Sequence, residues 1–292
     1  MKAIQCEKLT KYYGTARGII DVDLSVEEGD FFGFIGPNGA GKSTTIRILL
    51  GLIGESSGSV KIFDRDVSEN KTSLLTDIGY LPSEANFYSG MRVSDVLKLS
   101  AKLRGMNCDE EAKRLCERLD LDTTKKIEEL SLGNRKKVGI VCALQHKPKL
   151  YVLDEPTSGL DPLMQREFYN ILKERNEEGA TIFLSSHVLS EVERYCKHAA
   201  VIREGKIIVC DSIDRLSHTG IKAVTLKGAA EAPKIDGIKN TEKNDDGVSF
   251  LYSGEASALI RALADISFSD VTITDSELED SFMHYYEGGN EK

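Results

Sequence analysis

The sequence predicts an α/β fold: a core with a mixed β-sheet, an inserted helical subdomain and a small C-terminal α+β appendage. Three observations lead to this prediction. Short apolar runs that suit buried strands alternate with helical patterns before residue 86 and after residue 146. Residues 86–146 are helical in pattern, and after about Leu216 short strands separated by polar turns return. With 292 residues, we expect a main domain over residues 1–215 and an accessory domain over residues 216–292.

A glycine-rich loop between a strand and a helix is the most informative segment. Apolar residues 31–35 predict a buried strand, and residues 42–50 predict a helix. Between them the chain fits G-x-x-x-x-G-K-[ST], the phosphate-binding P-loop, with Gly36, Pro37, Asn38, Gly39, Ala40, Gly41, Lys42 and Ser43, closed by Thr44 and Thr45. Lys42 would contact the β- and γ-phosphates, and Ser43 would bind Mg²⁺. A glycine turn that binds nothing is the competing interpretation, but the flanking elements favour a P-loop NTPase core.

Two later strands end in polar residues. The run at residues 150–153 is followed by Asp154 and Glu155, and two acids at a buried strand end are costly unless they are used. Beside a P-loop, Asp154 suits a Walker-B partner of Mg²⁺, and Glu155 suits a residue that holds an attacking water. An ordinary acidic turn is the alternative. A strand at residues 180–184 leads to His187, which is either structural or part of a ligand site at the strand end.

The other elements follow from periodicity and turn residues. Residues 1–35 predict two or three strands, in which Tyr12 and Tyr13 either fill the strand or stack on a nucleotide base. Asp109 is the predicted N-cap of a helix at 109–119. The remaining elements are expected as strands at 59–63, 77–82 and 271–273, a hairpin at 199–203 and 207–210, and helices at 93–104, about 134–145, 163–175, 255–266 and about 276–286.

Composition and charge exclude several classes of protein. The net charge of −9 is concentrated after residue 213, where 15 Asp and Glu stand against 8 Lys and Arg, which argues against nucleic-acid binding and a polybasic membrane anchor. No apolar run approaches the ~18 residues of a membrane span. The first residues lack the apolar core of a signal peptide, and the six cysteines suit reduced, mostly buried thiols. We expect a cytoplasmic protein that can dock on a membrane protein.

Taken in order, these motifs over residues 1–215 resemble the ATP-binding cassette (ABC) family, as the nucleotide-binding subunit of a transporter. The resemblance implies that Tyr13 stacks on adenine and that residues 36–43 are the Walker A motif. It implies that Asp154 is the Walker B aspartate and that Glu155 is the catalytic carboxylate. We therefore expect ATP and Mg²⁺ to bind, and the helical subdomain at about 86–146 to pass motion to a membrane subunit.

The same resemblance covers two later motifs and the C-terminal part. It makes residues 158–161 the D-loop that crosses a dimer interface, and His187 the switch histidine that senses the γ-phosphate. The small C-terminal extension, with its pattern Leu278-Glu279-Asp280-Ser281-Phe282, is similar to the branch that serves ABC-2 type export permeases for lipids, drugs or peptides. The sequence therefore favours an exporter subunit.

Two segments depart from the family pattern. The usual signature is Leu-Ser-Gly-Gly-Gln, and here it reads Leu130-Ser131-Leu132-Gly133-Asn134. Ser131 and Gly133 keep the phosphate-contacting positions, whereas the Cβ of Leu132 restricts close backbone approach. Where the family usually has a glutamine that binds Mg²⁺ and couples to the permease, this chain has Ser83, whose hydroxyl would reach the metal only through water.

The resemblance implies a motor ATPase that works as a head-to-tail dimer with a second cassette, as a homodimer or a heterodimer, and with an integral membrane permease. ATP on one cassette would be covered by Ser131 and Gly133 of the other, while Glu155 polarises water, with His187 holding the geometry. The chain would be peripheral on the inner face of the cell membrane. Two other functions stay open: a soluble cassette protein acting on ribosomes or DNA, and a regulatory cassette with a weakened site. The cargo is not specified, because specificity resides in the permease.

Overall fold

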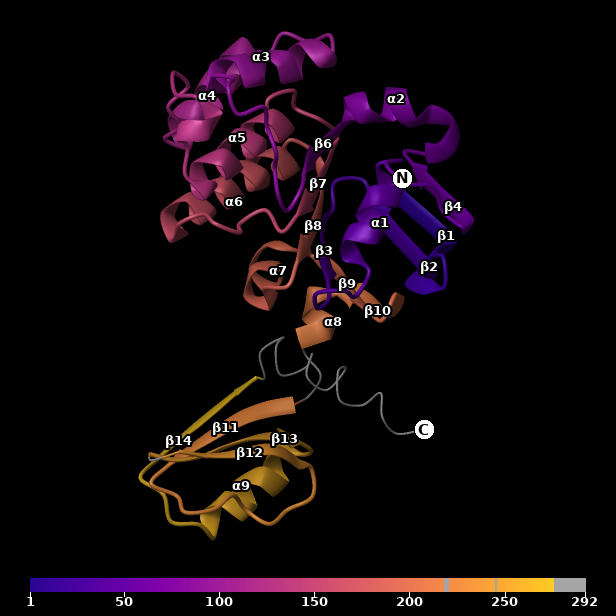
Figure 1. Ribbon diagram of the computed structural model, residues 1–292. Coiled ribbons are helices and arrows are strands. Elements are labelled where there is room, and N and C mark those ends of the chain that lie inside the picture. The colour runs from indigo at the N-terminus through magenta and orange to yellow at the C-terminus, as the bar shows by residue number, and fades with distance from the viewer. Residues whose placement is uncertain (218–220, 245, 276–292) are drawn as a thin grey trace. The chain divides into compact units, whose positions relative to one another are not determined.

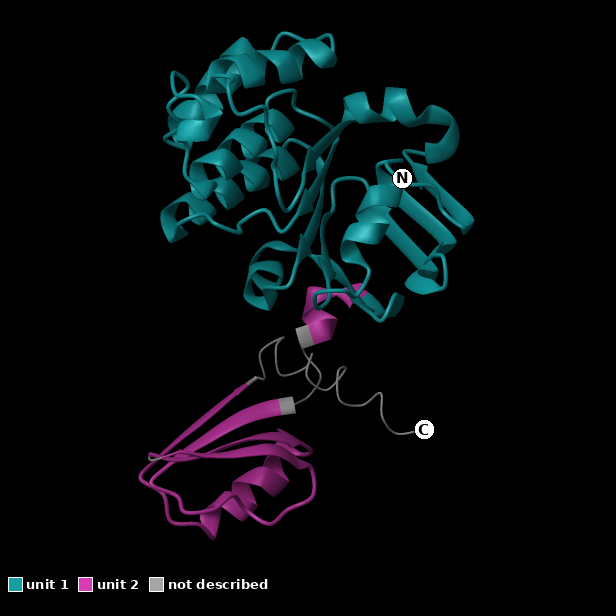
Figure 2. Ribbon diagram, in the orientation of Figure 1, with its two compact units in different colours: residues 1–210 teal, residues 211–292 magenta. Residues whose placement is uncertain are grey.

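The computed structural model describes residues 1–217, 221–244 and 246–275. It divides the chain into two compact units, residues 1–210 and 211–292, as Figure 2 shows, whereas the boundary expected from the sequence lies after residue 215. The expected helix at 276–286 and the pattern at 278–282 lie outside the described residues. Within the described ranges, no helix combines the length and the apolar character needed to cross a bilayer.

The first unit contains two β-sheets. One has the order β2-β1-β4-β5, with β1 (Lys2–Tyr13), β2 (Ala16–Glu27), β4 (Ser57–Ile62) and β5 (Arg65–Asp66) in antiparallel pairs. The other has the order β10-β9-β3-β8-β7-β6, with β3 (Phe31–Ile35), β6 (Ile78–Leu81), β7 (Leu150–Asp154), β8 (Thr181–Ser186), β9 (His198–Arg203) and β10 (Lys206–Ser212). Strands β3, β6, β7, β8 and β9 run parallel. A two-residue turn joins β9 to β10, and such a turn joins antiparallel strands, so the predicted mixed sheet is confirmed.

Helices cover both faces of the six-stranded sheet (Figure 1). On one side lie α3 (Val93–Leu103), α4 (Asp109–Arg118), α5 (Leu132–Leu144) and α6 (Pro162–Glu177). On the other side lie α1 (Lys42–Leu49) and the antiparallel sheet. The remaining short helices of this unit are α2 (Val67–Asp77), η1 (Ile127–Glu129) and α7 (Leu189–Tyr195). The helical subdomain expected between residues 86 and 146 thus corresponds to α3, α4, η1 and α5.

The central strands are buried on both faces, which explains their continuous apolar sequences. Every residue of β3, β7 and β8 is buried, as expected for parallel strands covered by helices on each side. Phe183 of β8 contacts Phe32 and Phe34 of β3, with ring centroids 6.0 and 5.3 Å apart. Burying each such ring contributes roughly 1.5–3 kcal/mol to folding. The ring contacts join β3 to β8, and the parallel pairing of β8 with both β3 and β7 places the carboxyl ends of the three strands side by side.

The second unit is a small α+β fold. Its sheet has the order β12-β13-β11-β14, from β11 (Ile221–Lys227), β12 (Ile238–Asn244), β13 (Gly247–Ser253) and β14 (Asp270–Asp275). The helix α9 (Ala256–Ala264) contributes Leu259 and Leu263 to a core with Val224, Leu226 and Phe250. The short helix α8 (Ile213–Ser217) precedes this sheet in sequence. The predicted fold class is therefore confirmed in both units.

The start of α4 corrects one prediction. Asp109 is the first helical residue and Cys108 occupies the N-cap position, so Asp109 is not the cap. The side chain of Asn107 accepts a hydrogen bond from the N–H of Asp109 at 3.0 Å. Asn107 therefore satisfies the first free N–H of the helix, as short polar side chains do at helix starts. Asp109 still places negative charge in the first turn, where the helix dipole favours it.

Candidate nucleotide-binding site

The loop between β3 and α1 has the open, glycine-dependent backbone that a phosphate cradle needs. Gly41 occupies the N-cap of α1 at φ 114°, and a Cβ there would lie 2.7 Å from Cγ2 of Ile19. At Gly36 a Cβ would lie 2.3 Å from the carbonyl oxygen of Ile202. Side chains at these two positions would fill the space beneath the loop, so the turn forms only with glycine. A helix N-terminus that follows such a loop has free N–H groups that can bind an anion.

Lysine and serine from the start of α1 meet the end of β7. Lys42 is buried, and its Nζ donates to the carbonyl oxygens of Gly36 at 2.5 Å and Pro37 at 3.3 Å. The hydroxyl of Ser43 donates to Oδ2 of Asp154 at 3.0 Å. Oδ1 of the same carboxylate accepts from the hydroxyl of Ser185, also at 3.0 Å. Asp154 is thus fixed on both oxygens, one of them beside the loop.

Glu155 follows β7 and is held from several directions. Its backbone adopts a positive φ of 48°, which is unfavourable for a residue with a Cβ. The N–H of Glu155 donates to the carbonyl oxygen of Ser185 at 2.9 Å. Its carboxylate lies 3.4 Å from Nζ of Lys42 through Oε1, and Oε2 accepts from Nδ1 of His187 at 2.7 Å. The structure therefore brings together Lys42, Glu155 and His187, which the sequence places far apart.

The carboxyl ends of the parallel strands explain this convergence. Asp154 is paired in register with Ser185, and Ile35 with Ser186, so the loops after β3, β7 and β8 begin at one sheet edge. In open α/β sheets, ligands bind at this edge. His187 itself is half-exposed, with 57% of its side chain accessible, whereas Asp154 is almost fully buried. This sheet edge therefore carries the buried carboxylate of Asp154 and, beside it, the pair of Glu155 and the solvent-exposed His187.

Lys136 is a part of this site that sequence reasoning missed. It lies inside α5 and is only 4% exposed, and its Nζ donates to the carbonyl oxygens of Glu155 and Ser83 at 2.9 Å and of Pro82 at 3.2 Å. Burial lowers the pKa of Lys136 to about 8, against the opposing effect of Asp154 and Glu155. A lysine in a helix gives no local sequence signal that distinguishes it from a solvated one.

The signature segment forms the N-terminus of α5. Ser131 is the N-cap, and its hydroxyl accepts from the N–H of Asn134 at 3.3 Å. Leu132 is 66% exposed, so its side chain points away from the core. A Cβ at Gly133 would lie 2.7 Å from the carbonyl oxygen of Gly159, which shows how closely the signature helix approaches the turn at residues 158–161. The contact with Gly159 was not predicted, because it joins segments that are distant in sequence.

The remaining candidate residues lie around this cluster. Tyr13 ends β1 with 45% of its surface exposed, and Nζ of Lys11 lies 5.7 Å from the centre of its ring. The hydroxyl of Thr45 donates to the carbonyl oxygen of Gly41 at 3.1 Å, inside the first turn of α1. Ser83 is exposed, and its described contact is the one that its carbonyl makes with Lys136. The predicted ligand roles of Thr45 and Ser83 stay predictions.

The oxygen atoms beside the loop suit a magnesium ion. The Ser43 hydroxyl and an Asp154 carboxylate oxygen are 3.0 Å apart, and Mg²⁺ prefers oxygen ligands with several waters. Over the ranges that the structure describes, no group of three or more His, Cys, Asp or Glu side chains could hold a metal. This sheet edge could therefore hold a metal ion that has few protein ligands and is also bound by a phosphate.

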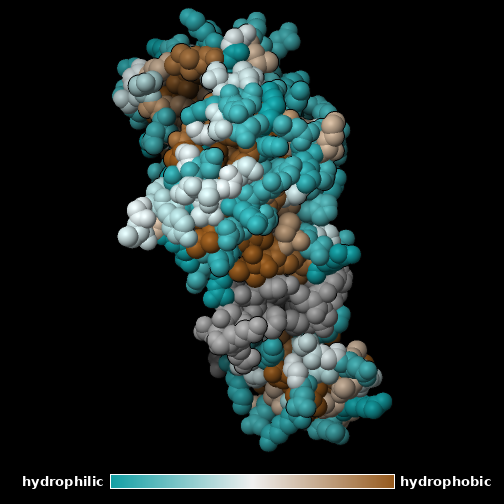
Figure 3. All heavy atoms as spheres, turned by 90° about the vertical axis from the view of Figure 1, so that its right-hand side faces the viewer, coloured by the Kyte–Doolittle hydropathy of each residue, from teal (hydrophilic) through white to brown (hydrophobic). Residues whose placement is uncertain are grey.

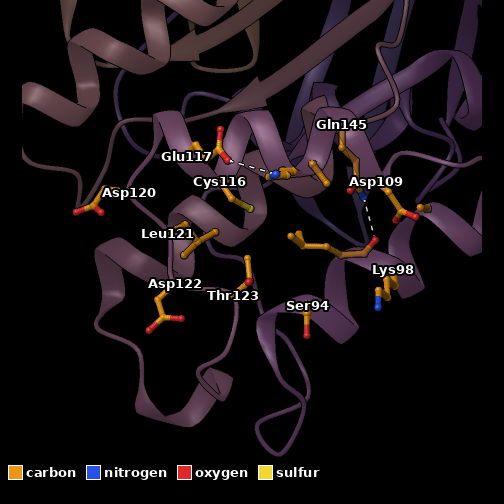
Figure 4. Close-up of a pocket in the computed structure, with 14 residues that line it drawn as sticks. Ser94, Lys98, Asp109, Cys116, Glu117, Asp120, Leu121, Asp122, Thr123 and Gln145 are labelled. Atoms are coloured by element: carbon orange, nitrogen blue, oxygen red, sulfur yellow. Dashed lines mark hydrogen bonds and ion pairs between the residues drawn. The ribbon is translucent and has the colours of Figure 1, made fainter.

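A cavity in the helical subdomain is separate from this cluster. It measures about 570 Å³ and is lined by residues of α3, α4 and the loop that follows, including Leu97, Cys116 and Leu121 (Figure 4). At its side, Nε2 of Gln145 donates to the carbonyl oxygen of Leu97 at 3.1 Å. None of the loop, strand-end or signature residues described above lines this cavity. Its position shows that a large cavity need not mark the phosphate site.

Comparison with known proteins identifies a family for this arrangement. The family model described as ABC transporter matches residues 19–158. The bacitracin transport ATP-binding protein BcrA of Bacillus licheniformis is 35% identical, and the match covers 98% of this chain and 98% of that protein.

Two solved structures are similar to the first unit. A structure described as the ATP-binding subunit of an ABC transporter has a TM-score of 0.69 and 30% identity, covering 73% of this chain and 91% of that one. A second, described as a dimeric ATP-binding cassette in a post-hydrolysis state bound to ADP and phosphate, has a TM-score of 0.67 and 24% identity, covering 72% and 98%. The second likeness concerns the fold alone.

Proposed function

This chain belongs to the ABC transporter family as an ATP-binding subunit with ATPase activity, and we propose that it hydrolyses Mg-ATP in a head-to-tail dimer to drive export through a separate membrane permease. The name of the bacitracin transport relative favours an antibiotic or another drug-like molecule as cargo. The chain would then act at the inner face of the cell membrane. The observation that carries the proposal is the joined cluster of Lys42, Asp154, Glu155 and His187 at one sheet edge.

The residues of this cluster divide the work of phosphoryl transfer. With ATP on the loop, Lys42 would move its hydrogen bonds from the carbonyls of Gly36 and Pro37 to phosphate oxygens and neutralise their charge. Glu155 would orient a water for in-line attack on the γ-phosphate, and His187 would hold its carboxylate. Ser43 and Asp154 would hold the Mg²⁺ ion, which supplies Lewis-acid stabilisation of phosphate charge when bound. Tyr13, at the exposed end of β1, would stack on adenine.

The head-to-tail dimer is supported by the signature at the start of α5. Ser131 and Gly133 present a helix N-terminus, and the exposed Leu132 beside them is an apolar side chain of the kind that interfaces cover. The cassette would therefore place Ser131 and Gly133 over the ATP of a second copy or of a related cassette.

An apolar groove in the helical subdomain suits contact with the permease. Figure 3 shows a hydrophobic patch at the top of the molecule, where Figure 1 places α3. Here a groove of about 470 Å³ is lined by Phe87, Tyr88, Met91 and Leu103, and both Tyr88 and Leu103 are 78% exposed. The groove lies on the segment between β6 and α3 that also contains Ser83, whose carbonyl Lys136 contacts. A permease segment bound there would be linked to the catalytic edge.

Turnover of ATP by Glu155→Gln tests the proposal. We expect about a 100- to 1000-fold lower rate in Mg²⁺-dependent ATP hydrolysis by the chain with its permease, because the neutral amide no longer polarises water. The exposed Glu177→Gln on α6 is the matched control and should keep the wild-type rate. Unchanged turnover by Glu155→Gln would refute the role of this residue. Tight ATP binding with negligible turnover in the wild-type complex would instead favour a regulatory cassette. The altered signature is the observation that supports this second function.

A further inference from the structure

Lys136 uses all of its donors on main-chain oxygens. A lysine ammonium has three N–H donors, and three carbonyls lie within 3.2 Å of Nζ, those of Pro82, Ser83 and Glu155. The first two belong to the loop after β6, and the third to the turn after β7. Because the acceptors come from two loops and the donor from α5, this one side chain fixes three segments relative to one another.

Packing alone does not explain a lysine at this position. Its side chain is 4% exposed, and a buried ammonium loses its hydration, so an apolar residue of the same length would serve the helix better. The adjacent Lys137 is 8% exposed and is also buried, but no hydrogen bond or ion pair joins its side chain to another described residue. The two neighbours thus share burial and charge, and they differ in their contacts with the catalytic edge.

The backbone of Glu155 is the contact that bears on chemistry. Its positive φ of 48° is unfavourable and persists only if surrounding contacts impose it. The N–H of Glu155 is held by the carbonyl of Ser185, and its C=O is held by Lys136. With both peptide groups held, the Cα–Cβ bond has one direction, and the carboxylate reaches both Lys42 and His187.

We propose that Lys136 is a positioning residue for Glu155, and that it makes the catalytic carboxylate move as one body with α5 and the loop containing Ser83. The proposal rests on the proposed catalytic role of Glu155. Since the signature serine is the N-cap of α5, roughly 7 Å along the helix from Lys136, seating Ser131 on a neighbouring cassette's nucleotide would adjust Glu155 in its own site. Lys136 would thereby couple the two composite sites of a dimer.

Three variants of the full chain in its transporter complex test this role. Lys136→Met removes the donors but keeps the length of the side chain, Lys136→Gln restores two N–H donors, and Lys137→Met is the matched control. We expect Lys136→Met to lower kcat for ATP about 10- to 100-fold with KM and ATP affinity within about threefold of wild type, because misplacing a catalytic group by about 1 Å has effects of this size. Lys136→Gln should recover most of kcat, and Lys137→Met should match wild type.

Several outcomes would overturn the proposal. These are a kcat for Lys136→Met within about twofold of wild type, a loss of ATP affinity as large as the loss of turnover, or a Lys136→Gln protein that folds and is as slow as Lys136→Met. If Lys136→Met does not fold, the outcome depends on the Lys136→Gln protein. A melting temperature and a kcat near the wild-type values for Lys136→Gln would then support the positioning role, because its two N–H donors replace those of the lysine. Glu155→Gln is measured in parallel: a fast Glu155→Gln contradicts the proposed function, whereas a slow one beside a fast Lys136→Met contradicts the positioning role alone.

Discussion

The two parts of the proposed nucleotide site differ in how completely the chain itself builds them. The P-loop part, with Lys42, Asp154 and Glu155, stands on buried strand ends, and its side chains already contact one another. The signature part, Ser131 to Asn134, is a helix N-terminus at the surface whose second residue is largely exposed. The difference teaches that the core of the chain itself organises the first part, whereas the second part, under the proposed function, would become a binding surface only against a partner.

Of the three effects that test this difference between the parts, the largest concerns ATP affinity at the P-loop part. Lys42→Met removes a buried ammonium that would bind phosphate, and charge-assisted hydrogen bonds of this kind contribute about 1.5–3 kcal/mol, so we expect about 10- to 100-fold weaker ATP binding. Equilibrium binding of a fluorescent ATP analogue measures the change, with the exposed Lys113→Met as control. If Lys42→Met bound ATP as tightly as wild type, Lys42 would not be part of the phosphate site.

A smaller effect concerns the attachment of α5 at its far end. Burial lowers the pKa of His146, which follows α5, to about 4, and its Nε2 lies 3.2 Å from the carbonyl oxygen of Ile78. In the unfolded chain His146 binds a proton below its ordinary pKa of about 6.5, whereas in the folded chain it stays neutral down to about pH 4. The free energy of unfolding therefore decreases as the pH is lowered from about 6.5 to 4. His146 should lower the free energy of unfolding by about 2 kcal/mol when the pH changes from 7 to 5.

Urea unfolding of wild type and His146→Gln at both pH values measures this term. The variant should lose about 2 kcal/mol less than wild type on acidification, because glutamine does not titrate. If the free energy of unfolding depended on pH in the same way in both proteins, the neutral imidazole of His146 would not stabilise the end of α5.

The smallest effect concerns the signature cap. Ser131→Ala removes the hydroxyl that caps α5, which should lower the free energy of unfolding by about 1 kcal/mol. ATP affinity of the isolated chain should stay at the wild-type value, because Ser131 would act on a partner's nucleotide, while turnover of the dimer falls. Calorimetry and binding measure the two quantities. A loss of affinity in the isolated chain comparable to that of Lys42→Met would erase the contrast between the two parts.

Sequence patterns predict the P-loop part well and the rest less completely. The strand, loop and helix around Gly41 and the acids after β7 are local signals, so their elements were predictable. The helices α2 and α7 were not, because α2 is polar, contains a non-helical residue at Asn70 and has a weak apolar face. The division of the strands into two sheets depends on long-range pairing, such as that of Ile4 with Ile62, which no local pattern contains. Lys136 was missed for the same reason: its partners lie on other elements.

The close approach of Gly133 to Gly159 limits which side chains the signature of this chain can accept. Leu132 projects from the surface, so side chains of different sizes would fit at this position. Position 133 has no such freedom, because any larger residue there would meet the backbone at 159. The chain therefore folds with leucine at position 132, the first glycine position of the usual signature, whereas position 133 is as restricted in size as a position in the core.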